Sequence, residues 1–590
     1  MEPLRLGLYK LLRRKYGWFQ PIAYQWHIFL AYIIMIGWSS ILQNPFYRLF
    51  IIFLHAYLAA SLVHWLHNRW VKVLVYIAMF ALFIINASLE VNFGLHISPS
   101  MLNLLAETSR KEATEFIHTL WSIPTIWVVP TLVILFILFL FLSERKRITV
   151  AERILCSKAY IYIQMVSAVM LAVGTVSSWC YITLFQCKTP DEVSEWNSHM
   201  RYPSDALTRA IIAFHDIRLA SKEMEKAILI AENVEPFTYD TGISDSLSVV
   251  LVIGESYIKS HASLYGYPLK TTPFMDKEQD EGRLFAFTDV VSPYNLTTNA
   301  MRNLISCNSM ADDENWSDMP PLTAVFKKAG YKVSMFDNQK TFSLAATFTF
   351  ALNTYLYSPR ISKVCYDELN SKTYDYDEQL VRECHPSHSS PRHLVVFHLM
   401  GQHIQFNQRY PEHDHRFSVF SADSIKRREK WLNYGKKKLI AQYDNATYYN
   451  DYVLSVIARK YKDKNAIMVY LADHGEEVYD YRNSSGRFGS DDLKNVLRFQ
   501  YEVPFVVWCS DIYKQSHPHE IDLLKQALDR PFMTDNTCQL LLYIGGLSGS
   551  AYYKDNRNII SPQYQKGKRI LNDCYDYDLI LEKHKEANRE

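Results

Sequence analysis

Five long apolar segments lie before residue 187, and they limit the possible folds of this chain more than any other feature. They run approximately over residues 24–42, 49–67, 71–89, 123–142 and 161–185. Each approaches the roughly 20 residues that span a hydrocarbon core of about 30 Å. Tryptophans gather toward the segment ends, where an indole prefers the membrane interface. The sequence therefore predicts a transmembrane domain of five helices over residues 1–187.

Basic residues in the short connections predict the orientation of these helices. Lysines and arginines concentrate in residues 5–15, 69–72 and 145–158, and such segments resist translocation. All three are expected on the cytoplasmic side. An odd number of spans then places everything after residue 185 outside the cytoplasm. The first apolar segment is too long for a cleavable signal and is followed by further spans.

Composition excludes several classes of protein. The net charge of +2 over 590 residues gives no sign of a nucleic-acid partner, and 49% hydrophobic residues with 19 glycines exclude a disordered or fibrous chain. Nine cysteines are present, with no CxxC pair, so a thiolate zinc cluster is not expected. Cys156 is predicted to be cytoplasmic, and Cys365 with Cys384 is the first pair expected to form a disulfide.

The exported part has the pattern of an α/β domain. Residues 188–245 are polar and predict a linker with an amphipathic helix over 205–232. From residue 246 to 590, short apolar runs alternate with helical patterns, which predicts a mostly parallel central sheet. The expected strands are 248–253, 331–336, 393–399, 466–471 and 503–508.

Polar residues follow the first four of these strands. Because parallel sheets bind ligands beyond the carboxyl ends of their strands, these residues are expected to meet at one edge. They are Gly254-Glu255-Ser256, Asp337-Asn338-Gln339-Lys340, Gly401-Gln402-His403 and Asp473-His474-Gly475-Glu476. Glutamate, aspartate and histidine supply the oxygen and nitrogen ligands that suit zinc or a similar divalent ion.

A hydroxyl-rich loop is the candidate source of a nucleophile. Residues 292–299 enter a helical pattern over 299–307. A hydroxyl at a helix start is usually an N-cap, but the same position also suits an anion such as phosphate. Metal coordination would lower the pKa of the hydroxyl and make it a usable nucleophile at neutral pH.

These residues resemble the membrane-anchored phosphoethanolamine transferases, whose catalytic domain has the alkaline phosphatase and sulfatase type of fold. The resemblance covers most of the chain and adds an ordered set of motifs to the five-span anchor. The motifs are Gly254-Glu255-Ser256, Ser263-Leu264-Tyr265-Gly266-Tyr267, Thr271-Thr272-Pro273, Met400-Gly401-Gln402-His403, Arg409-Tyr410-Pro411, Tyr443-Asp444-Asn445 and Asp473-His474-Gly475-Glu476.

The resemblance implies a mechanism and a set of site residues. Phosphatidylethanolamine would donate phosphoethanolamine to a threonine, and an acceptor on lipopolysaccharide, lipid A or core, would then receive it. Thr297 is expected to be the nucleophile because it follows Ser292 by five residues, the spacing that the family shows between its loop serine and its nucleophile, with Thr298 as the alternative. The implied zinc ligands are Glu255, Thr297, Asp473 and His474; His403 is the second catalytic residue; the implied substrate-binding residues are Asn338, Lys340, Thr108 and Glu112.

The same resemblance implies a location and an assembly. The protein is expected in the cell inner membrane as a multi-pass, monomeric enzyme with its catalytic domain in the periplasm. The acidic tail of the Asp473-His474-Gly475-Glu476-Glu477 segment and the proline-containing nucleophile loop favour the lipopolysaccharide-core branch.

The sequence departs from the family pattern at two places in the exported domain. Pro293 occupies the position of a cysteine that many members pair with a second one beyond the nucleophile, so Cys307 is not expected to form that disulfide. Members also carry a further histidine after the DHG segment, and residues 479–510 contain none. Arg487 is one residue that could take its place.

Three alternative functions follow from the same residues. A sulfatase would need a C/S-x-P-x-R pattern, and Cys384-His385-Pro386-Ser387-His388 has histidine in place of the arginine. A glycerol phosphotransferase acting on a glucan or polymer shares the anchor and the threonine. An inactive, membrane-tethered binding domain is the third alternative, but it would have no need for a buried Glu, Asp and His together.

Overall fold

The structure is a computed structural model that divides the chain into two compact units. It describes residues 19–35, 45–66, 68–93, 160–190, 206–237, 246–339, 355–386, 390–487 and 492–587, with isolated positions between 131 and 196. One unit comprises Met1–Lys222 with Ser343–Phe350, and the other comprises Glu223–Phe342 with Ala351–Glu590. The second unit holds the predicted chemistry.

The first unit is helical. Its described helices are α2 (Gln20–Tyr24), α3 (Trp26–Met35), α5 (Pro45–Trp65), α6 (Arg69–Phe93), α10 (Tyr160–Ser177) and α11 (Cys180–Leu184), followed by α13 (Ala206–Glu232), which continues into the second unit. Among the described residues, two stretches are long and apolar enough to cross a membrane, Trp70–Ala87 and Tyr162–Leu184, and Leu49–Trp65 is a shorter apolar helix. The predicted span at 123–142 lies almost wholly outside the described residues. Helix α13 confirms the predicted amphipathic helix.

A seven-stranded sheet forms the centre of the second unit. The strand order is β2-β8-β7-β1-β6-β4-β5. Strands β1, β4, β5, β6 and β7 run parallel, whereas β8 is antiparallel to β7 and β2 is antiparallel to β8. The bounds are β1 (Leu247–Gly254), β2 (Leu284–Phe287), β4 (Lys332–Asp337), β5 (Glu368–Leu369), β6 (Arg392–His398), β7 (Ala466–Ala472) and β8 (Phe505–Cys509).

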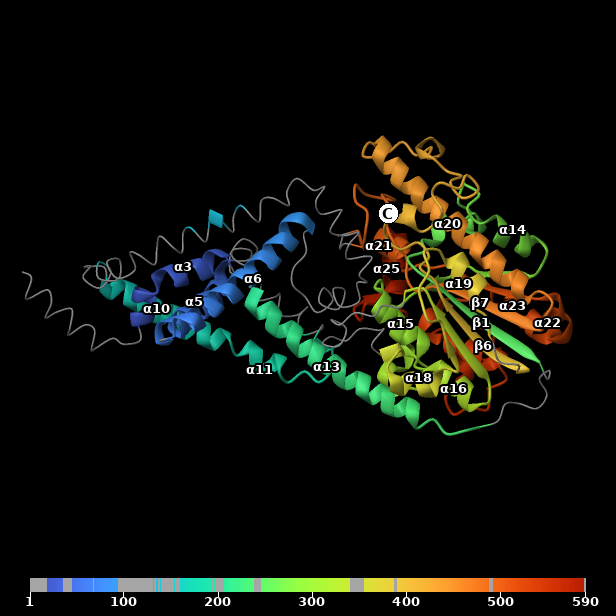
Figure 1. Ribbon diagram of the computed structural model, residues 1–590, viewed down its shortest axis with the longest axis horizontal. Helices are drawn as coiled ribbons and strands as arrows, with labels where there is room; N and C mark the ends of the chain where they lie inside the picture. The colour runs from blue at the N-terminus through green and yellow to red at the C-terminus, as the bar shows by residue number, and fades with distance from the viewer. Residues whose placement is uncertain are drawn as a thin grey trace, which may run out of the picture. The chain divides into compact units, whose positions relative to one another are not determined.

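Helices cover both faces of this sheet, as a mostly parallel sheet requires. Figure 1 shows α20 (Tyr434–Tyr461) on one side with α14 (Pro273–Asp280) and α19 (Asp377–Glu383) near it. On the other side lie α15 (Thr297–Ile305), α16 (Leu322–Lys328) and α18 (Pro359–Cys365). The remaining longer helices are α21 (Leu493–Gln500), α22 (Asp511–Ser516), α23 (Pro518–Ala527), α24 (Thr537–Ile544) and α25 (Tyr577–Ala587).

Short elements complete the unit. Strands β3 (Val290–Val291) and β9 (Phe532–Met533) pair in parallel, and β10 (Ile570–Leu571) pairs with β11 (Tyr575–Asp576). All five predicted strands are present within one or two residues of the expected bounds. The run at the last of them, β8, is apolar enough to predict a buried strand, but its sequence does not reveal its antiparallel direction. The predicted α/β domain with a mostly parallel sheet is confirmed.

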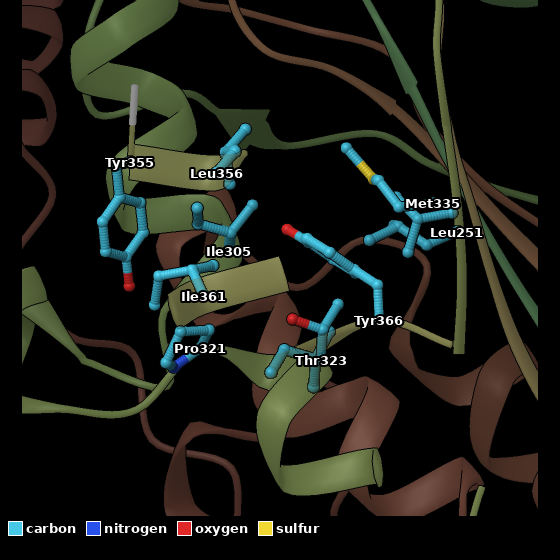
Figure 2. Close-up of a pocket in the computed structure, with 11 residues that line it drawn as sticks. Leu251, Ile305, Pro321, Thr323, Met335, Tyr355, Leu356, Ile361 and Tyr366 are labelled. Carbon is cyan, nitrogen blue, oxygen red and sulfur yellow. The ribbon is translucent and has the colours of Figure 1, made fainter. Parts of the chain in front are cut away.

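A small apolar cavity lies inside this unit, away from the polar edge of the sheet. Its volume is about 20 Å³. Leu251 of β1, Met335 of β4 and Ile305 at the end of α15 line it together with Tyr355 and Tyr366 (Figure 2). Its walls are mostly hydrocarbon, so it is a gap in the packing between the sheet and α15 rather than a place for polar chemistry.

Candidate active site

The carboxyl ends of β1 and β7 bring the first two predicted ligands together. Gly254 and Ala472 are paired in register, so the next residues, Glu255 and Asp473, leave the sheet side by side. The N–H of Asp473 donates to the carbonyl of Gly254 at 3.0 Å. The N–H of Ser256 donates to Oδ1 of Asp473 at 3.1 Å. These two hydrogen bonds connect the loop after β1 with the loop after β7, and neither depends on a ligand.

Glu255, Asp473 and His474 form a buried cluster. One ligand atom from each lies within 4.8 Å of the others. Nε2 of His474 lies 3.3 Å from Oε1 of Glu255 and 3.2 Å from Oδ2 of Asp473. Nδ1 of His474 lies 2.7 Å from the carbonyl of Gly475. Because a carbonyl only accepts, Nδ1 carries the proton and Nε2 presents its lone pair to the two carboxylates.

This arrangement fits a divalent cation. Three atoms with lone pairs face one another in a site from which solvent is excluded, and a cation between them would remove the repulsion. Oδ2 of Asp473 accepts no hydrogen bond from the described part of the chain. One imidazole nitrogen and two carboxylates are ligands that zinc accepts, and the Nδ1 bond to a carbonyl is the support typical of a metal-bound histidine.

The pKa values of Glu255 and His474 are held low, which leaves both groups able to bind a cation. Burial acts to raise the pKa of Glu255, but its contact with His474 and the charges of His403 and Arg487 hold it well below its ordinary value. Burial and the neighbouring Arg487 cation lower the pKa of His474. Burial and then the charge of Glu255 raise the pKa of Asp473 well above its ordinary range. A cation would therefore replace the proton that Asp473 otherwise takes up.

Thr297 places its hydroxyl against this cluster. Helix α15 begins at Thr297, and its N-cap residue Leu296 provides no side-chain cap. Oγ1 of Thr297 lies 3.2 Å from both carboxylate oxygens of Glu255 and 3.2 Å from Nε2 of His474. The hydroxyl is thus turned to the cluster rather than to the helix start. Thr297 is partly exposed, whereas Thr298 is buried.

Two residues without a predicted role orient Glu255. Nε2 of Gln339, just after β4, donates to Oε2 of Glu255 at 3.2 Å and to the carbonyl of Leu399 at 2.7 Å. Gly401 has a φ of +50°, and a Cβ at this position would lie 2.7 Å from the backbone nitrogen of Glu255. The MGQH pattern could have indicated the second, because a glycine beside ligands often permits close backbone approach. The polar run after β4 places the first at the same edge of the sheet, but nothing in the sequence singles out Gln339 within that run.

The other predicted residues have mixed outcomes. His403 contributes positive charge at both Glu255 and Glu476. The side chain of Asn338 is held inside the fold, donating to Asp377 at 2.8 Å and accepting from the N–H of Tyr374 at 2.7 Å. Its role in binding substrate stays a prediction. Lys340, Thr108 and Glu112 lie outside the described residues.

A second cluster of two carboxylates and one histidine lies near the loop that follows β1. The sequence did not predict it. Nδ1 of His261 is 2.7 Å from Oδ1 of Asp444, and its Nε2 is 2.9 Å from Oδ1 of Asp480. Tyr267 donates to the other oxygen of Asp444 at 2.9 Å. Tyr443 donates to the carbonyl of Ser256 at 2.7 Å, which connects this cluster to the residue after Glu255.

The predicted pairing of Cys365 with Cys384 is wrong. Both are free thiols in the structure. Cys365 ends α18, which packs on α16, whereas Cys384 follows α19, which packs on α20. Sγ of Cys384 lies 3.6 Å from the hydroxyl of Tyr374 instead. The two cysteines flank one polar stretch in sequence, but the helices that carry them belong to different packed pairs.

Comparison with known proteins shows which families and enzymes the chain is similar to. The sulfatase family model matches residues 248–530. Phosphoethanolamine transferase EptC of Escherichia coli strain K12 is 26% identical over 83% of this chain and 82% of its own length. Phosphoethanolamine transferase CptA of Salmonella typhimurium is 26% identical over 87% of this chain and 86% of its own. The resemblance drawn from the motifs is therefore confirmed.

Solved structures agree. The periplasmic domain of E. coli EptC in complex with zinc is 27% identical, with a TM-score of 0.50 over 58% of this chain and 97% of that one. The integral membrane lipooligosaccharide phosphoethanolamine transferase A of Neisseria meningitidis shares the fold, with a TM-score of 0.55 at 15% identity, over 94% of this chain and 98% of that one. The alkaline phosphatase and sulfatase type of fold is thus confirmed for the second unit.

Proposed function

We propose that this protein is a metal-dependent phosphoethanolamine transferase, because residues 248–530 match the sulfatase family model and the similar proteins are phosphoethanolamine transferases. The observation that carries the proposal is the position of the Thr297 hydroxyl. It lies 3.2 Å from the carboxylate of Glu255 and 3.2 Å from the unprotonated nitrogen of His474. A threonine so placed is a nucleophile rather than a helix cap.

Thr297 accepts the group covalently in this proposal. Its oxygen attacks phosphorus of the donor, the bond to the lipid oxygen breaks, and diacylglycerol leaves with a proton. In the second half-reaction an acceptor hydroxyl or phosphate attacks the phosphothreonine, and Thr297 regains its proton. The partial positive end of α15 stabilises the phosphoryl group in both halves. His403, whose charge acts on Glu255, serves as the proton donor to the leaving group.

Zinc is the proposed cofactor. Glu255, Asp473, His474 and the hydroxyl of Thr297 would hold it, and when bound it supplies the Lewis acidity that stabilises negative charge on phosphoryl and threonine oxygens. The buried position of the three ligands excludes water from the reacting atoms. The chain itself contributes the fixed Nδ1–H bond to Gly475, which sets the tautomer of His474.

The first unit is the proposed anchor to the inner membrane. Two apolar helices long enough to span, and the basic connections between predicted spans, support a multi-pass topology of five helices with the second unit in the periplasm. An anchored catalytic domain matches a lipid donor, phosphatidylethanolamine. The proposed acceptor is lipopolysaccharide, lipid A or core, and the protein is proposed to act as a monomer.

The test is mass spectrometry of lipopolysaccharide and glucan fractions from cells that lack or express the protein. A phosphoethanolamine increment that disappears in Thr297→Ala and persists in Thr298→Ala is the expected result, and the modified fraction names the acceptor. A glycerol phosphate increment would favour the glycerol phosphotransferase alternative. No increment in any fraction would contradict a transferase and favour the binding domain instead.

A further inference from the structure

Arg487 reaches the cluster from the segment after β7. Its NH1 donates to the carbonyl of Asn295 at 2.8 Å, and its Nε lies 3.3 Å from Oε2 of Glu476. The same NH1 lies 3.1 Å from Nδ1 of His474 and contacts Nε2 of that ring. The side chain is 20% exposed, so one edge of the guanidinium faces out of the site while the other faces in.

Two of these contacts, those with Asn295 and Glu476, do not involve His474. Asn295 lies two residues before Thr297, and its own side chain donates to Gln500 at 2.9 Å, which braces the nucleophile loop. Glu476 is buried, with 5% exposure, and the Arg487 charge acts to lower its pKa against the effect of burial. The guanidinium is therefore held near the nucleophile by the loop that presents the nucleophile.

A cation in the ligand cluster and Arg487 compete for one lone pair. Nε2 of His474 is the nitrogen that presents a lone pair, and both Oγ1 of Thr297 and NH1 of Arg487 now lie against it. A metal bound to this lone pair would leave the guanidinium able to donate to another acceptor. The contacts with Asn295 and Glu476 would still hold the side chain in place. The group that Thr297 attacks would lie beside the same ring and could supply this acceptor.

The charges at the site favour a phosphoryl group as this acceptor. Glu255, Asp473 and the threonine oxygen together offset more than the two charges of a single divalent ion, so a phosphoryl anion needs a further cation. A guanidinium is planar, stays charged and presents paired N–H groups that match two phosphoryl oxygens. Arg487 is the arginine that the described residues place on the ligand cluster.

We propose that Arg487 is a catalytic residue that binds the nonbridging oxygens of the transferred phosphoryl group. This inference rests on the proposed function and adds a residue to it. The guanidinium binds the phosphoryl oxygens of the donor and holds them as the group passes to Thr297 and on to the acceptor; a metal held by the ligand cluster would free it from His474. It binds the group as a fixed cation and transfers no proton.

The experiment compares the full-length wild type with Arg487→Ala, Arg487→Lys and Arg498→Ala, the last an exposed arginine on α21. Three quantities are measured: zinc per chain, affinity for O-phosphoethanolamine by calorimetry, and the rate at which Thr297 is modified from phosphatidylethanolamine vesicles. Arg487→Ala should retain zinc, bind O-phosphoethanolamine about tenfold more weakly and react about 10²-fold more slowly. Arg487→Lys should fall between, and methylguanidinium should partly restore Arg487→Ala. Arg498→Ala should match the wild type.

An Arg487→Ala variant with unchanged affinity for O-phosphoethanolamine and an unchanged rate of Thr297 modification would overturn the inference. A loss of zinc equal to the loss of rate would also overturn it, because Arg487 would then support the metal site. A wild type that binds zinc but never modifies Thr297 would instead contradict the proposed function. In that case the O-phosphoethanolamine affinities alone decide whether Arg487 binds the phosphoryl group.

A separate observation concerns two cysteines behind the nucleophile helix. Sγ of Cys307 and Sγ of Cys538 lie 2.6 Å apart, closer than unbonded sulfur atoms approach. Both are buried. Cys307 comes two residues after the end of α15, and Cys538 lies in α24, which packs on α15. A link here would hold the helix of Thr297 against the carboxyl-terminal part of the unit.

We infer that Cys307 and Cys538 form a disulfide in the mature protein. The proposed periplasmic location supplies the oxidant, a protein disulfide that accepts two electrons and two protons as the two thiols join. Cells are quenched with acid, free thiols are alkylated, and the full-length protein is digested without reduction. The expected product is one linked pair of peptides, with Cys365 and Cys384 alkylated as internal controls.

Alkylated Cys307 and Cys538 would overturn the disulfide. Exposed Cys574 reports the compartment in the same cells, because a membrane-impermeant maleimide labels it in spheroplasts only if the domain is exported. Labelled Cys574 with free Cys307 and Cys538 thus contradicts the disulfide alone. Unlabelled Cys574 contradicts the proposed topology. In Cys307→Ser, Cys538 should become fully alkylated.

Discussion

Two clusters of the same composition, two carboxylates and one histidine, flank the loop after β1 and differ in what their histidine does. Both nitrogens of His261 are occupied by carboxylates, Asp444 at 2.7 Å and Asp480 at 2.9 Å. His474 instead gives Nδ1–H to a carbonyl and turns its Nε2 lone pair to Glu255 and Asp473. The first cluster is a closed ion network; the second is open to a cation.

Hydrogen bonding, rather than residue type, therefore separates a metal site from a buried salt bridge in this domain. Burial acts to lower the pKa of His261, but the charges of Asp480 and Asp444 raise it from 6.5 to about 10, so the ring carries its own positive charge. Burial and Arg487 lower the pKa of His474, so this ring stays neutral. A protonated histidine satisfies its two carboxylates, whereas a neutral one needs a metal to do so.

The strongest effect should come from removing one carboxylate of the open cluster. Glu255→Gln leaves the shape of the side chain but removes a charged ligand, so zinc affinity should fall by about 10² or more. Zinc per chain is measured in full-length protein after dialysis against a weak chelator. His261→Gln is the matched control from the closed cluster and should retain zinc. Equal loss of zinc in both variants would refute the distinction between the clusters.

The closed cluster should matter for stability rather than metal. His261→Gln leaves Asp444 buried without a cation, while Asp480 keeps its 3.4 Å contact with Arg427, and leaving a buried carboxylate unpaired costs about 3–5 kcal/mol. The contribution of His261 is fully present below pH 6.5 and is lost as the pH rises toward about 10, because the folded-state pKa is the higher one.

Denaturant unfolding of the full chain, followed by a spectroscopic signal of the catalytic domain from about pH 6 to about pH 10, measures this contribution. The gap between the wild type and His261→Gln should narrow as the pH rises. A gap that stays constant across this range would show that His261 acts through packing instead of charge.

Backbone approach offers a third comparison. In Gly401→Ala the new Cβ would lie 2.7 Å from the nitrogen and 2.9 Å from the oxygen of Glu255, so the ligand must move. We expect about a tenfold weaker zinc affinity, measured by chelator competition. Gly266→Ala has a φ of +92° but nothing within 4 Å, so it should cost only about 1 kcal/mol of stability and leave zinc affinity unchanged. A larger loss of zinc affinity in Gly266→Ala than in Gly401→Ala would contradict a close approach of the Gly401 loop to Glu255.

Tyr267→Phe should have a smaller effect on stability than His261→Gln. It removes the 2.9 Å hydrogen bond to Asp444 without removing charge, and a bond to a charged acceptor contributes about 1.5–3 kcal/mol. The loss should lie below that of His261→Gln in the same unfolding experiment. A double variant in which the two losses fail to add would show that both residues serve one network.

Much of the fold and of the ligand set could be predicted because continuous runs of residues in the sequence mark both. Apolar segments marked the strands, and polar residues after β1 and β7 marked the ligands Glu255, Asp473 and His474. The strand ends predicted that Glu255 and the segment of Gln339 share one edge, although not the hydrogen bond between them. Contacts between residues outside these four segments could not be predicted in this way, as when His261 reaches Asp480 across 219 positions. The pairing of Cys365 with Cys384 failed because nearness in sequence says nothing about which helices pack together.

Peptide mass spectrometry of the full-length, zinc-loaded protein after incubation with phosphatidylethanolamine vesicles would decide whether Thr297 is the nucleophile. We predict a phosphoethanolamine increment on Thr297, release of diacylglycerol in equal amount, and no increment in Thr297→Ala. An unmodified Thr297 in zinc-loaded protein, or an increment carried by Thr298, would contradict the assignment of Thr297 as the nucleophile.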